Sequence, residues 1–378
     1  MIVEINARAA GSDRSAEWLA SSPTPYYLYD LKRLRCRVEE FRAAFAATEH
    51  SLFFATMAND CPPVLETLAA LNVGACVNSQ AHLELAWSAG FSQVQFTSTA
   101  LGADDMERLL ETNTPVNLDS AGQISAWGGL GGTHAGLRIN AASLGAGRPR
   151  DRIGVAAADV QRLRGVAREV GVQLNGLHVY VGTNLRHHEE ALPTITALFE
   201  LAERLPELEY LNLGGGVGVN YARKGPDFDV AAYGAGVSQL WERLCRKRGR
   251  PIRLVIEPGR GLVAACGAFF TRITDIKLLD GQRFVGVDGS IAIFPRPFHH
   301  PDSPHHIELA ERCLAQSSEF VEFQIVGRTT FSRDILGIAR LPTDLAPGDL
   351  IVFRDAGAYS QSMRSRFLGQ REPEIRCV

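Results

Sequence analysis

Lysine is scarce in this chain, which has only four, at positions 32, 224, 247 and 277, while arginine is abundant. Few side chains can therefore supply a reactive amine. The chain also lacks a run of about 18 apolar residues, the length needed to cross a bilayer. Its first residues, Met-Ile-Val-Glu-Ile-Asn, lack the basic start and apolar stretch of a secretion signal. We therefore expect a cytoplasmic protein with no membrane partner.

The chain also has no closely spaced cysteine pairs and no large excess of positive or negative charge. The seven cysteines show no Cys-x-x-Cys pattern, which favours free thiols in a reducing compartment over disulfides or zinc. The net charge is −3 and 21% of residues are charged, which excludes a disordered chain and argues against a nucleic-acid-binding surface. Repeats and low-complexity segments are missing. What remains is a globular protein of 378 residues, large enough for two domains.

The first two thirds of the chain alternate short β-branched segments with longer amphipathic ones. Eight such βα units follow one another over about 220 residues, which favours a closed parallel (β/α)8 barrel over a doubly wound sheet. The expected strands are 51–56, 73–77, 93–97, 115–118, 136–140, 174–181, 209–213 and 253–257. The clearest helices are 101–112, 157–171, 190–204 and 231–248.

After about residue 265 the pattern changes to clustered strands with Gly-Asp and Pro-Gly turns, which predicts an antiparallel β-domain. The expected strands are 267–277, 283–288, 321–326 and 350–353. A strand-like segment, Tyr26-Tyr27-Leu28-Tyr29, lies near the start. We therefore predict an α/β protein with three parts: an N-terminal strand segment (1–36), a barrel (37–265) and a β-domain (266–378).

In such a barrel the active site lies where the strands end. The seventh strand runs into Gly214-Gly215-Gly216, a glycine run whose backbone N–H groups can approach a phosphate; a plain tight turn is the alternative. The eighth strand ends in Glu257-Pro258-Gly259-Arg260. Arg260 could hold an anion there, either a phosphate or a substrate carboxylate, or form an ordinary surface ion pair.

The first strand gives the most informative segment, Phe54-Ala55-Thr56-Met57-Ala58-Asn59. Together with the glycine run and Glu257-Pro258-Gly259-Arg260, it resembles the alanine-racemase-like (fold type III) pyridoxal-phosphate enzymes, which include the ornithine and diaminopimelate decarboxylases. That family has a lysine at the position of Met57, and this lysine holds the cofactor as a Schiff base. A thioether can neither condense with an aldehyde nor carry protons.

The resemblance extends from about Tyr26 to Tyr359 and implies roles for individual residues. Glu257 would keep the pyridine nitrogen protonated, which makes the ring a better electron sink. Tyr180 takes the place of a histidine that stacks on the cofactor, or else fills the barrel core. Asn59 and His178 would lie behind the contact residues, although His178 could equally be a core histidine. The implied contacts to the cofactor are Tyr180, Thr183, Gly214, Gly215, Gly216, Glu257, Gly259, Arg260 and, through its hydroxyl, Tyr359.

The resemblance also implies a homodimer with shared sites, and an N-terminal strand that joins the β-domain. Arg296 would contact the distal end of an amino-acid substrate, and His300 follows it where relatives place a substrate-contacting tyrosine. The segment matching Thr330 in one subunit would complete the site of the other.

Besides Tyr180, four positions depart from the family pattern. Met57 replaces the lysine, Thr330 replaces the cysteine that usually donates a proton, and Phe331 replaces an acid that binds a distal amino group. Cys76 stands where the family commonly has aspartate. An apolar ring at 331 argues against a cationic substrate side chain, so we expect an anionic or bulky one, in secondary metabolism.

The leading interpretation is a pyridoxal-phosphate-dependent decarboxylase impaired by Met57, with the cofactor bound non-covalently or absent. The alternatives are a natural non-catalytic regulator or binding protein on the same fold, and an enzyme of altered chemistry, such as a racemase or a cofactor-independent catalyst. Met57 could be a deliberate inactivating substitution or a natural change. The retained cofactor motifs favour an active parent with lysine at this position.

Three histidine pairs, 187–188, 299–300 and 305–306, raise the question of a metal site. Adjacent residues on a strand point in opposite directions, and no cluster of carboxylates accompanies the pairs. We therefore expect solvated loop histidines and no metal.

Overall fold

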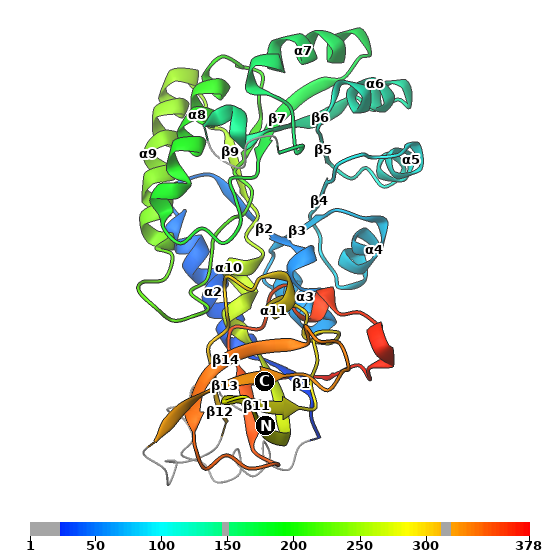
Figure 1. Ribbon diagram of the computed structural model, residues 1–378. Coiled ribbons are helices and arrows are strands. Elements are labelled where there is room, and N and C mark those ends of the chain that lie inside the picture. The colour runs from blue at the N-terminus through cyan, green and yellow to red at the C-terminus, as the bar shows by residue number, and fades with distance from the viewer. Residues whose placement is uncertain (1–22, 146–150, 311–318) are drawn as a thin grey trace. The chain divides into compact units, whose positions relative to one another are not determined.

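Eight short parallel strands close into a barrel in the computed structural model, which describes residues 23–145, 151–310 and 319–378 (Figure 1). Each strand pairs with the next along the chain, and the last pairs with the first. The barrel strands are β2 (His50–Ala55), β3 (Gly74–Val77), β4 (Val94–Thr97), β5 (Val116–Leu118), β6 (His134–Ile139), β7 (Gln173–Val179), β8 (Tyr210–Asn212) and β9 (Arg253–Ile256).

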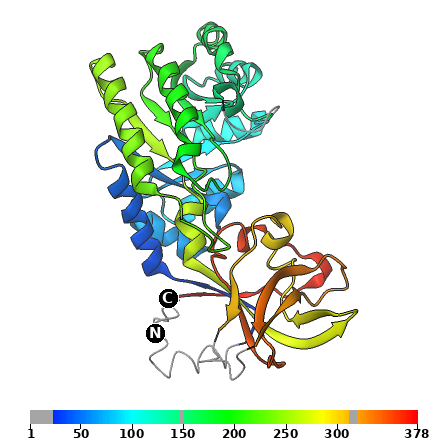
Figure 2. The same ribbon diagram turned by 60° about the vertical axis from the view of Figure 1, so that its left-hand side comes forward.

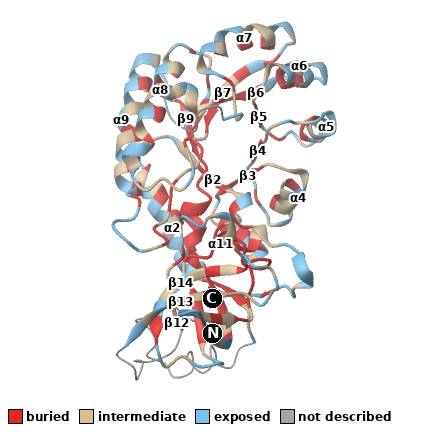
Figure 3. Ribbon diagram, in the orientation of Figure 1, coloured by how far each residue is buried: buried red, intermediate tan, exposed pale blue. Residues whose placement is uncertain are grey.

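Helices follow the barrel strands and cover them from outside (Figure 2). Figure 3 shows the strands as largely buried and the outer faces of the helices as exposed. The helix α2 (Leu31–Ala44) precedes the first barrel strand. The others are α3 (Pro62–Ala70), α4 (Gln80–Ser88), α5 (Ala103–Glu111), α6 (Ala121–Gly129), α7 (Val160–Glu169), α8 (Leu192–Glu203), α9 (Val230–Arg248) and the short α10 (Arg260–Val263).

The ring of Tyr210 packs inside the barrel, against β6 and β7. Gly136 and Gly176 make room for it: a Cβ at position 136 would lie 2.1 Å from the Tyr210 hydroxyl, and one at position 176 would lie 2.0 Å from its ring. Side chains on a strand alternate between its two faces, so Tyr210 and Asn212 both point inward. The barrel interior therefore contains polar side chains in addition to its apolar ones.

Two compact units share the described residues, and each is considered by itself. The barrel unit comprises 35–219 and 227–262, and the β unit comprises the described parts of 1–34, 220–226 and 263–378. The predicted domain limits, 1–36, 37–265 and 266–378, stay predictions as boundaries of independently folding parts.

The β unit is built on one sheet. Its strands run in the order β12 (Ile307–Leu309), β15 (Leu350–Phe353), β10 (Gly267–Leu279), β11 (Gln282–Val287), β13 (Phe320–Val326) and β14 (Ile335–Pro342). The N-terminal β1 (Tyr26–Tyr29) pairs with β10, which confirms that this segment joins the sheet, and β16 (Glu374–Cys377) pairs with β1. A short helix, α11 (Arg296–His299), interrupts the loop after β11.

The predicted barrel is confirmed, while the β unit needs three corrections. It is not wholly antiparallel, because β11–β13 and β1–β16 pair in parallel. Three of its strands, β12, β14 and β16, were not predicted. The histidine pair 299–300, predicted to lie in a loop, is at the end of the short helix α11.

Six cysteines are free thiols in the described part of the chain, and Cys313 lies outside it. None of the helices in residues 23–145, 151–310 and 319–378 has the length and apolar character that a membrane crossing requires.

Candidate cofactor site

The segment with Met57 lies at the carboxyl end of the first barrel strand. Thr56, Met57 and Ala58 form a single 3₁₀ turn, η1 (Thr56–Ala58), directly after β2. The Met57 side chain is 45% exposed although it is large and apolar. Asn59 is buried, and its Oδ1 accepts the N–H of Cys61, just before α3. Position 57 therefore lies at the carboxyl-terminal end of the barrel strands, where the family lysine was expected.

Glu257 is the buried carboxylate at the end of the last barrel strand, with 6% of its surface exposed. The Nδ2 of Asn212 donates to its Oε1 at 2.6 Å, and the Nε2 of His178 lies 3.2 Å from its Oε2. The thiol of Cys76 also hydrogen-bonds to it. The strands β3, β7 and β8 thus each direct one polar side chain at the same carboxylate.

These contacts determine the protonation of the cluster. Burial by itself would raise the pKa of Glu257, but its interaction with His178 and the hydrogen bonds from Asn212 and Cys76 hold that pKa below its usual value. Burial lowers the pKa of His178, against the opposing attraction of Glu257. Burial, and then the Glu257 charge, raise the pKa of Cys76 well above its ordinary value. At neutral pH we therefore assign an ionised Glu257 beside a neutral imidazole and a neutral thiol.

The guanidinium of Arg138 lies in the same electrostatic environment. Arg138 is on β6, in register with His178 on β7. Burial lowers its pKa, and the charges of Glu257 and Asp119 act in the opposite direction. Its Nε is buried and has no hydrogen-bond partner among the described residues. Arg138 therefore supplies a positive charge that counters the Glu257 carboxylate.

The glycine run lies between two barrel strand ends and leaves backbone donors available. Gly214 adopts φ 65° and Gly216 φ 99°, and a Cβ at Gly215 would lie 2.6 Å from the Glu257 carbonyl oxygen. Gly214 accepts the N–H of Glu257. Within the described part of the chain, the N–H groups of Gly215 and Gly216 have no acceptor. This open pair of donors suits a phosphate.

Tyr180 and Thr183 lie together just after β7. Their hydroxyl groups are hydrogen-bonded to each other, and Thr183 is exposed. Tyr180 is half-buried, so it does not fill the barrel core. The predicted stacking and phosphate contacts of these two residues stay predictions.

The turn after β9 is tight. A Cβ at Gly259 would lie 2.8 Å from the Cβ of Ala58, so this position requires a glycine. Arg260 begins α10 and is buried, with 6% of its surface exposed.

Within the β unit, Arg296 is engaged by its own neighbours. Its side chain is 1% exposed, lies 3.4 Å from the ring centroid of Tyr221, and donates to the carbonyl oxygen of Ser303 at 2.9 Å. The backbone N–H of His300 donates to the carbonyl oxygen of Arg296 at 2.8 Å. Tyr359 is half-buried and has a left-handed φ of 53°. The substrate and phosphate contacts predicted for Arg296, His300 and Tyr359 stay predictions.

The loop with Thr330 and Phe331 is held by the buried carboxylate of Asp334. Its Oδ1 accepts from Ile291 N at 2.8 Å and its Oδ2 from Thr329 N at 3.0 Å. Thr330 is exposed. The ring of Phe331 packs edge-on against Phe298 and Phe367. The loop therefore has the Thr330 hydroxyl next to the aromatic ring of Phe331, where the family has a cysteine thiol next to an acid.

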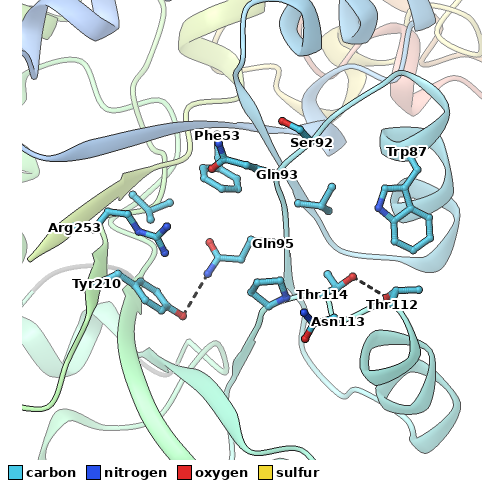
Figure 4. Close-up of a pocket in the computed structure, with 13 residues that line it drawn as sticks. Phe53, Trp87, Ser92, Gln93, Gln95, Thr112, Asn113, Thr114, Tyr210 and Arg253 are labelled. Carbon is cyan, nitrogen blue, oxygen red and sulfur yellow. Dashed lines mark hydrogen bonds between the residues drawn. The ribbon is translucent and has the colours of Figure 1, made fainter.

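A cavity of about 330 Å³ lies at the opposite, amino-terminal ends of the barrel strands (Figure 4). Gln93, Gln95, Tyr210 and Arg253 line it, and none of the predicted site residues does. Figure 4 shows Gln95 directed at the Tyr210 hydroxyl.

Sequence reasoning assigned no site role to Asn212, Gln95 and Arg138, and it identified Cys76 only as a departure from the family pattern. The sequence does carry a signal for Asn212, which alternates with Tyr210 on the inward face of β8. Its contact with Glu257 depends on the pairing of β8 with β9, which a local sequence pattern does not show.

The lowered pKa of His178 makes stability depend on pH. An unfolded histidine takes up a proton near about pH 6.5, whereas the buried imidazole resists it. The contribution of His178 to stability is therefore complete above about pH 6.5 and is lost as pH falls through the lowered folded-state pKa. We expect His178→Gln to flatten the fall in unfolding free energy between about pH 7 and about pH 5, measured by urea unfolding. His134→Gln, at an exposed histidine, is the control, and equal slopes in the two variants would contradict this assignment.

Comparison with known proteins gives one consistent family. Residues 31–264 match the pyridoxal-binding domain of pyridoxal-dependent decarboxylases. A diaminopimelate decarboxylase of Neisseria meningitidis serogroup A is 29% identical over 91% of this chain and 87% of its own length. That of Methanothermobacter thermautotrophicus is 25% identical over 98% of this chain and 91% of its own length.

Solved structures agree on the fold. Diaminopimelate decarboxylase from Helicobacter pylori, complexed with L-lysine, superposes with a TM-score of 0.86 at 24% identity and covers 96% of this chain and 93% of its own. Lysine/ornithine decarboxylase from Vibrio vulnificus, complexed with cadaverine, has a TM-score of 0.84 at 18% identity and covers 96% of both chains.

The barrel residues suit pyridoxal phosphate. The unused N–H groups of Gly215 and Gly216 match a phosphate, and the ionised Glu257 matches a protonated pyridine nitrogen. A side chain at Gly214, Gly215 or Gly216 would clash with the backbone of a neighbouring segment, so the loop keeps its close approach to the adjacent strand ends. Since the family match also spans more than half of the chain, this protein belongs to the pyridoxal-dependent decarboxylase family.

Proposed function

We propose that this chain is a decarboxylase of an amino acid with an anionic or bulky side chain, and that Met57 impairs it. The observation that carries the proposal is the ionised, triply hydrogen-bonded Glu257 next to the open glycine donors. When bound, pyridoxal phosphate supplies an electron-accepting ring that stabilises negative charge at Cα as the α-carboxylate leaves.

The chain's own residues would do the rest. Gly215 and Gly216 would hold the phosphate through their N–H groups, with Thr183, Arg260 and Tyr359 as further contacts. Glu257 would keep a proton on the pyridine nitrogen, and Tyr180 would lie against the ring. The Met57 thioether cannot bond to the cofactor aldehyde, so binding would be non-covalent and turnover negligible.

The substrate class rests on the β unit. The named relatives are diaminopimelate decarboxylases. In this chain Phe331 packs with Phe298 and Phe367, which gives no counter-charge to a distal ammonium group. We therefore propose a substrate other than diaminopimelate. The exposed Thr330 on a rigid loop suits a homodimer in which it reaches the partner's site.

Met57 together with Cys76 favours a second candidate, a natural non-catalytic binding protein. The family lysine and aspartate carry opposite charges, and both positions are uncharged here. Position 76 is paired in register with Ala55, two residues before Met57, and its thiol hydrogen-bonds to Glu257. Loss of the lysine alone would leave an aspartate at 76 beside the Glu257 carboxylate, so the two changes are electrostatically matched.

Cofactor binding tests the proposal. We expect the unaltered chain to bind pyridoxal phosphate reversibly, seen as quenched tryptophan fluorescence that is recovered on dialysis. Gly215→Ala should weaken binding by about tenfold or more, equivalent to about 1.4 kcal/mol, because its Cβ would clash with the Glu257 carbonyl. The control is Gly165→Ala, in α7, where a Cβ meets nothing within 4 Å. Equal binding by both variants, or none by the parent, would count against a cofactor site.

A further inference from the structure

Asn212, at the end of β8, contacts both of the proposed cofactor-binding elements of the barrel. It is fully buried. Its Oδ1 accepts the N–H of Gly214 at 2.8 Å, and its Nδ2 donates to Glu257 Oε1 at 2.6 Å and to Gln95 Oε1 at 3.0 Å. One amide therefore joins the start of the glycine loop to the carboxylate.

The orientation of this amide follows from its partners. A backbone N–H can only donate, so the Gly214 contact requires the carbonyl oxygen of Asn212. The amide nitrogen must then face Glu257, which as a carboxylate can only accept. With three contacts, the Asn212 side chain has one arrangement that satisfies every partner.

A chain of buried hydrogen bonds fixes Asn212 from behind. Gln95 Nε2 donates to the Tyr210 hydroxyl at 3.3 Å, and that hydroxyl donates to Asn117 Oδ1 at 2.8 Å. Asn117 Nδ2 donates in turn to Thr97 Oγ1 at 2.8 Å. Gln95, Tyr210 and Asn117 are all buried. Each member determines the orientation of the next, so Asn212 cannot rotate without leaving several buried groups unpaired.

We propose that Asn212 is a positioning residue that sets the distance between the phosphate-holding glycine loop and Glu257, and keeps Glu257 available as an anion for the pyridine nitrogen. The inference rests on the proposed function for the cofactor contacts, but not for the Asn212–Glu257 bond itself. Neither the family motifs nor the comparisons with relatives assign Asn212 a role.

Most of the groups around Glu257 are uncharged donors, and Arg138 supplies a positive charge. The groups that face it are His178 from β7, Cys76 from β3, Arg138 from β6, and Tyr210 with Asn212 from β8. Glu257 is the single carboxylate among these groups. A second carboxylate at position 212 would lie within hydrogen-bonding distance of the first, and the pair would retain a proton.

Asn212→Asp tests the proposal, because it preserves shape and the Gly214 contact while replacing the donor with an acid. In the unaltered chain we expect pyridoxal phosphate to bind with its pyridine nitrogen protonated, as read by NMR of the ¹⁵N-labelled cofactor. In Asn212→Asp we expect affinity to fall about tenfold or more and the ¹⁵N signal to move toward the unprotonated position.

The pH dependence of unfolding of the cofactor-free protein tests the inference independently. A carboxyl pair has a raised folded-state pKa, so its contribution to stability is lost as pH rises. The unfolding free energy of Asn212→Asp should therefore fall between about pH 5 and about pH 8 relative to the parent. The control is Asn175→Asp, which places the same change beside the exposed Glu209, 2.9 Å from the amide, and should alter none of these quantities.

The outcomes separate the two proposals. If the parent does not bind the cofactor, the proposed function fails, and the pH dependence of unfolding still decides the inference. Parent-like affinity, ¹⁵N shift and pH slope in Asn212→Asp would overturn it. If that variant does not fold, Gln95→Met, which removes the acceptor behind Asn212, should weaken cofactor binding in the same direction, and parent-like binding there would overturn the inference.

Discussion

Met57→Lys is expected to convert this chain from negligible turnover to measurable release of carbon dioxide from an amino acid. The position lies at the strand-end face of the barrel, directly after β2, and its side chain is 45% exposed. An amine there can bond to the cofactor aldehyde, which a thioether cannot. Glu257, the glycine donors and Thr183 are already present, so one substitution restores the missing group.

The measurement is carbon dioxide release over a panel of acidic, bulky and basic amino acids, with products weighed by mass spectrometry. Loss of the mass of carbon dioxide indicates decarboxylation, whereas an unchanged mass with inverted configuration indicates a racemase. Met57→Gln, of similar length but without an amine, is the control and should stay inactive. A Met57→Lys protein that binds the cofactor yet transforms no amino acid would favour the non-catalytic candidate.

Glu257→Gln, made in the Met57→Lys background, is expected to lower turnover by roughly 100-fold, since a buried hydrogen bond to a charged group contributes about 1.5–3 kcal/mol. The amide cannot keep a proton on the pyridine nitrogen, so the ring loses much of its capacity to accept electrons. The amide can still accept from Asn212 Nδ2 or from His178 Nε2, so the barrel should remain folded.

Turnover should fall more than cofactor affinity, because the phosphate contacts remain. The control is Glu242→Gln, an exposed residue on α9 that forms a long ion pair with Arg246. Turnover in Glu257→Gln close to that of its parent would show that this carboxylate does not act on the cofactor ring.

The barrel could be predicted because its signal is local. Short apolar segments separated by amphipathic stretches recur eight times, and all eight predicted strands are present in order. The β unit was harder for a physical reason. Its β12 has three residues, and β14 and β16 have half-exposed faces with charged residues such as Arg340 and Arg376, so neither has the apolar character of a buried strand.

Parts of the candidate site could be predicted where close backbone contacts permit only glycine, because the glycines then form a recognisable sequence motif. Gly215 and Gly259 adjoin other backbone or Cβ atoms too closely for a side chain, and Glu257 lies next to them. The residues that hold Glu257 belong to separate strands. Their convergence is set by barrel closure and by inward alternation, which local sequence patterns do not encode. His178 illustrates the difference: the sequence left its role open, and the geometry places it against Glu257.

The most direct test of the central claim is to trap the cofactor on the protein. Met57→Lys would be incubated with pyridoxal phosphate, reduced with borohydride and digested, and the labelled peptide identified by mass spectrometry. We predict one dominant label, at position 57, and none there in the unaltered chain. A label confined to Lys32, Lys224, Lys247 and Lys277, or no label, would contradict a cofactor site that lacks only its amine.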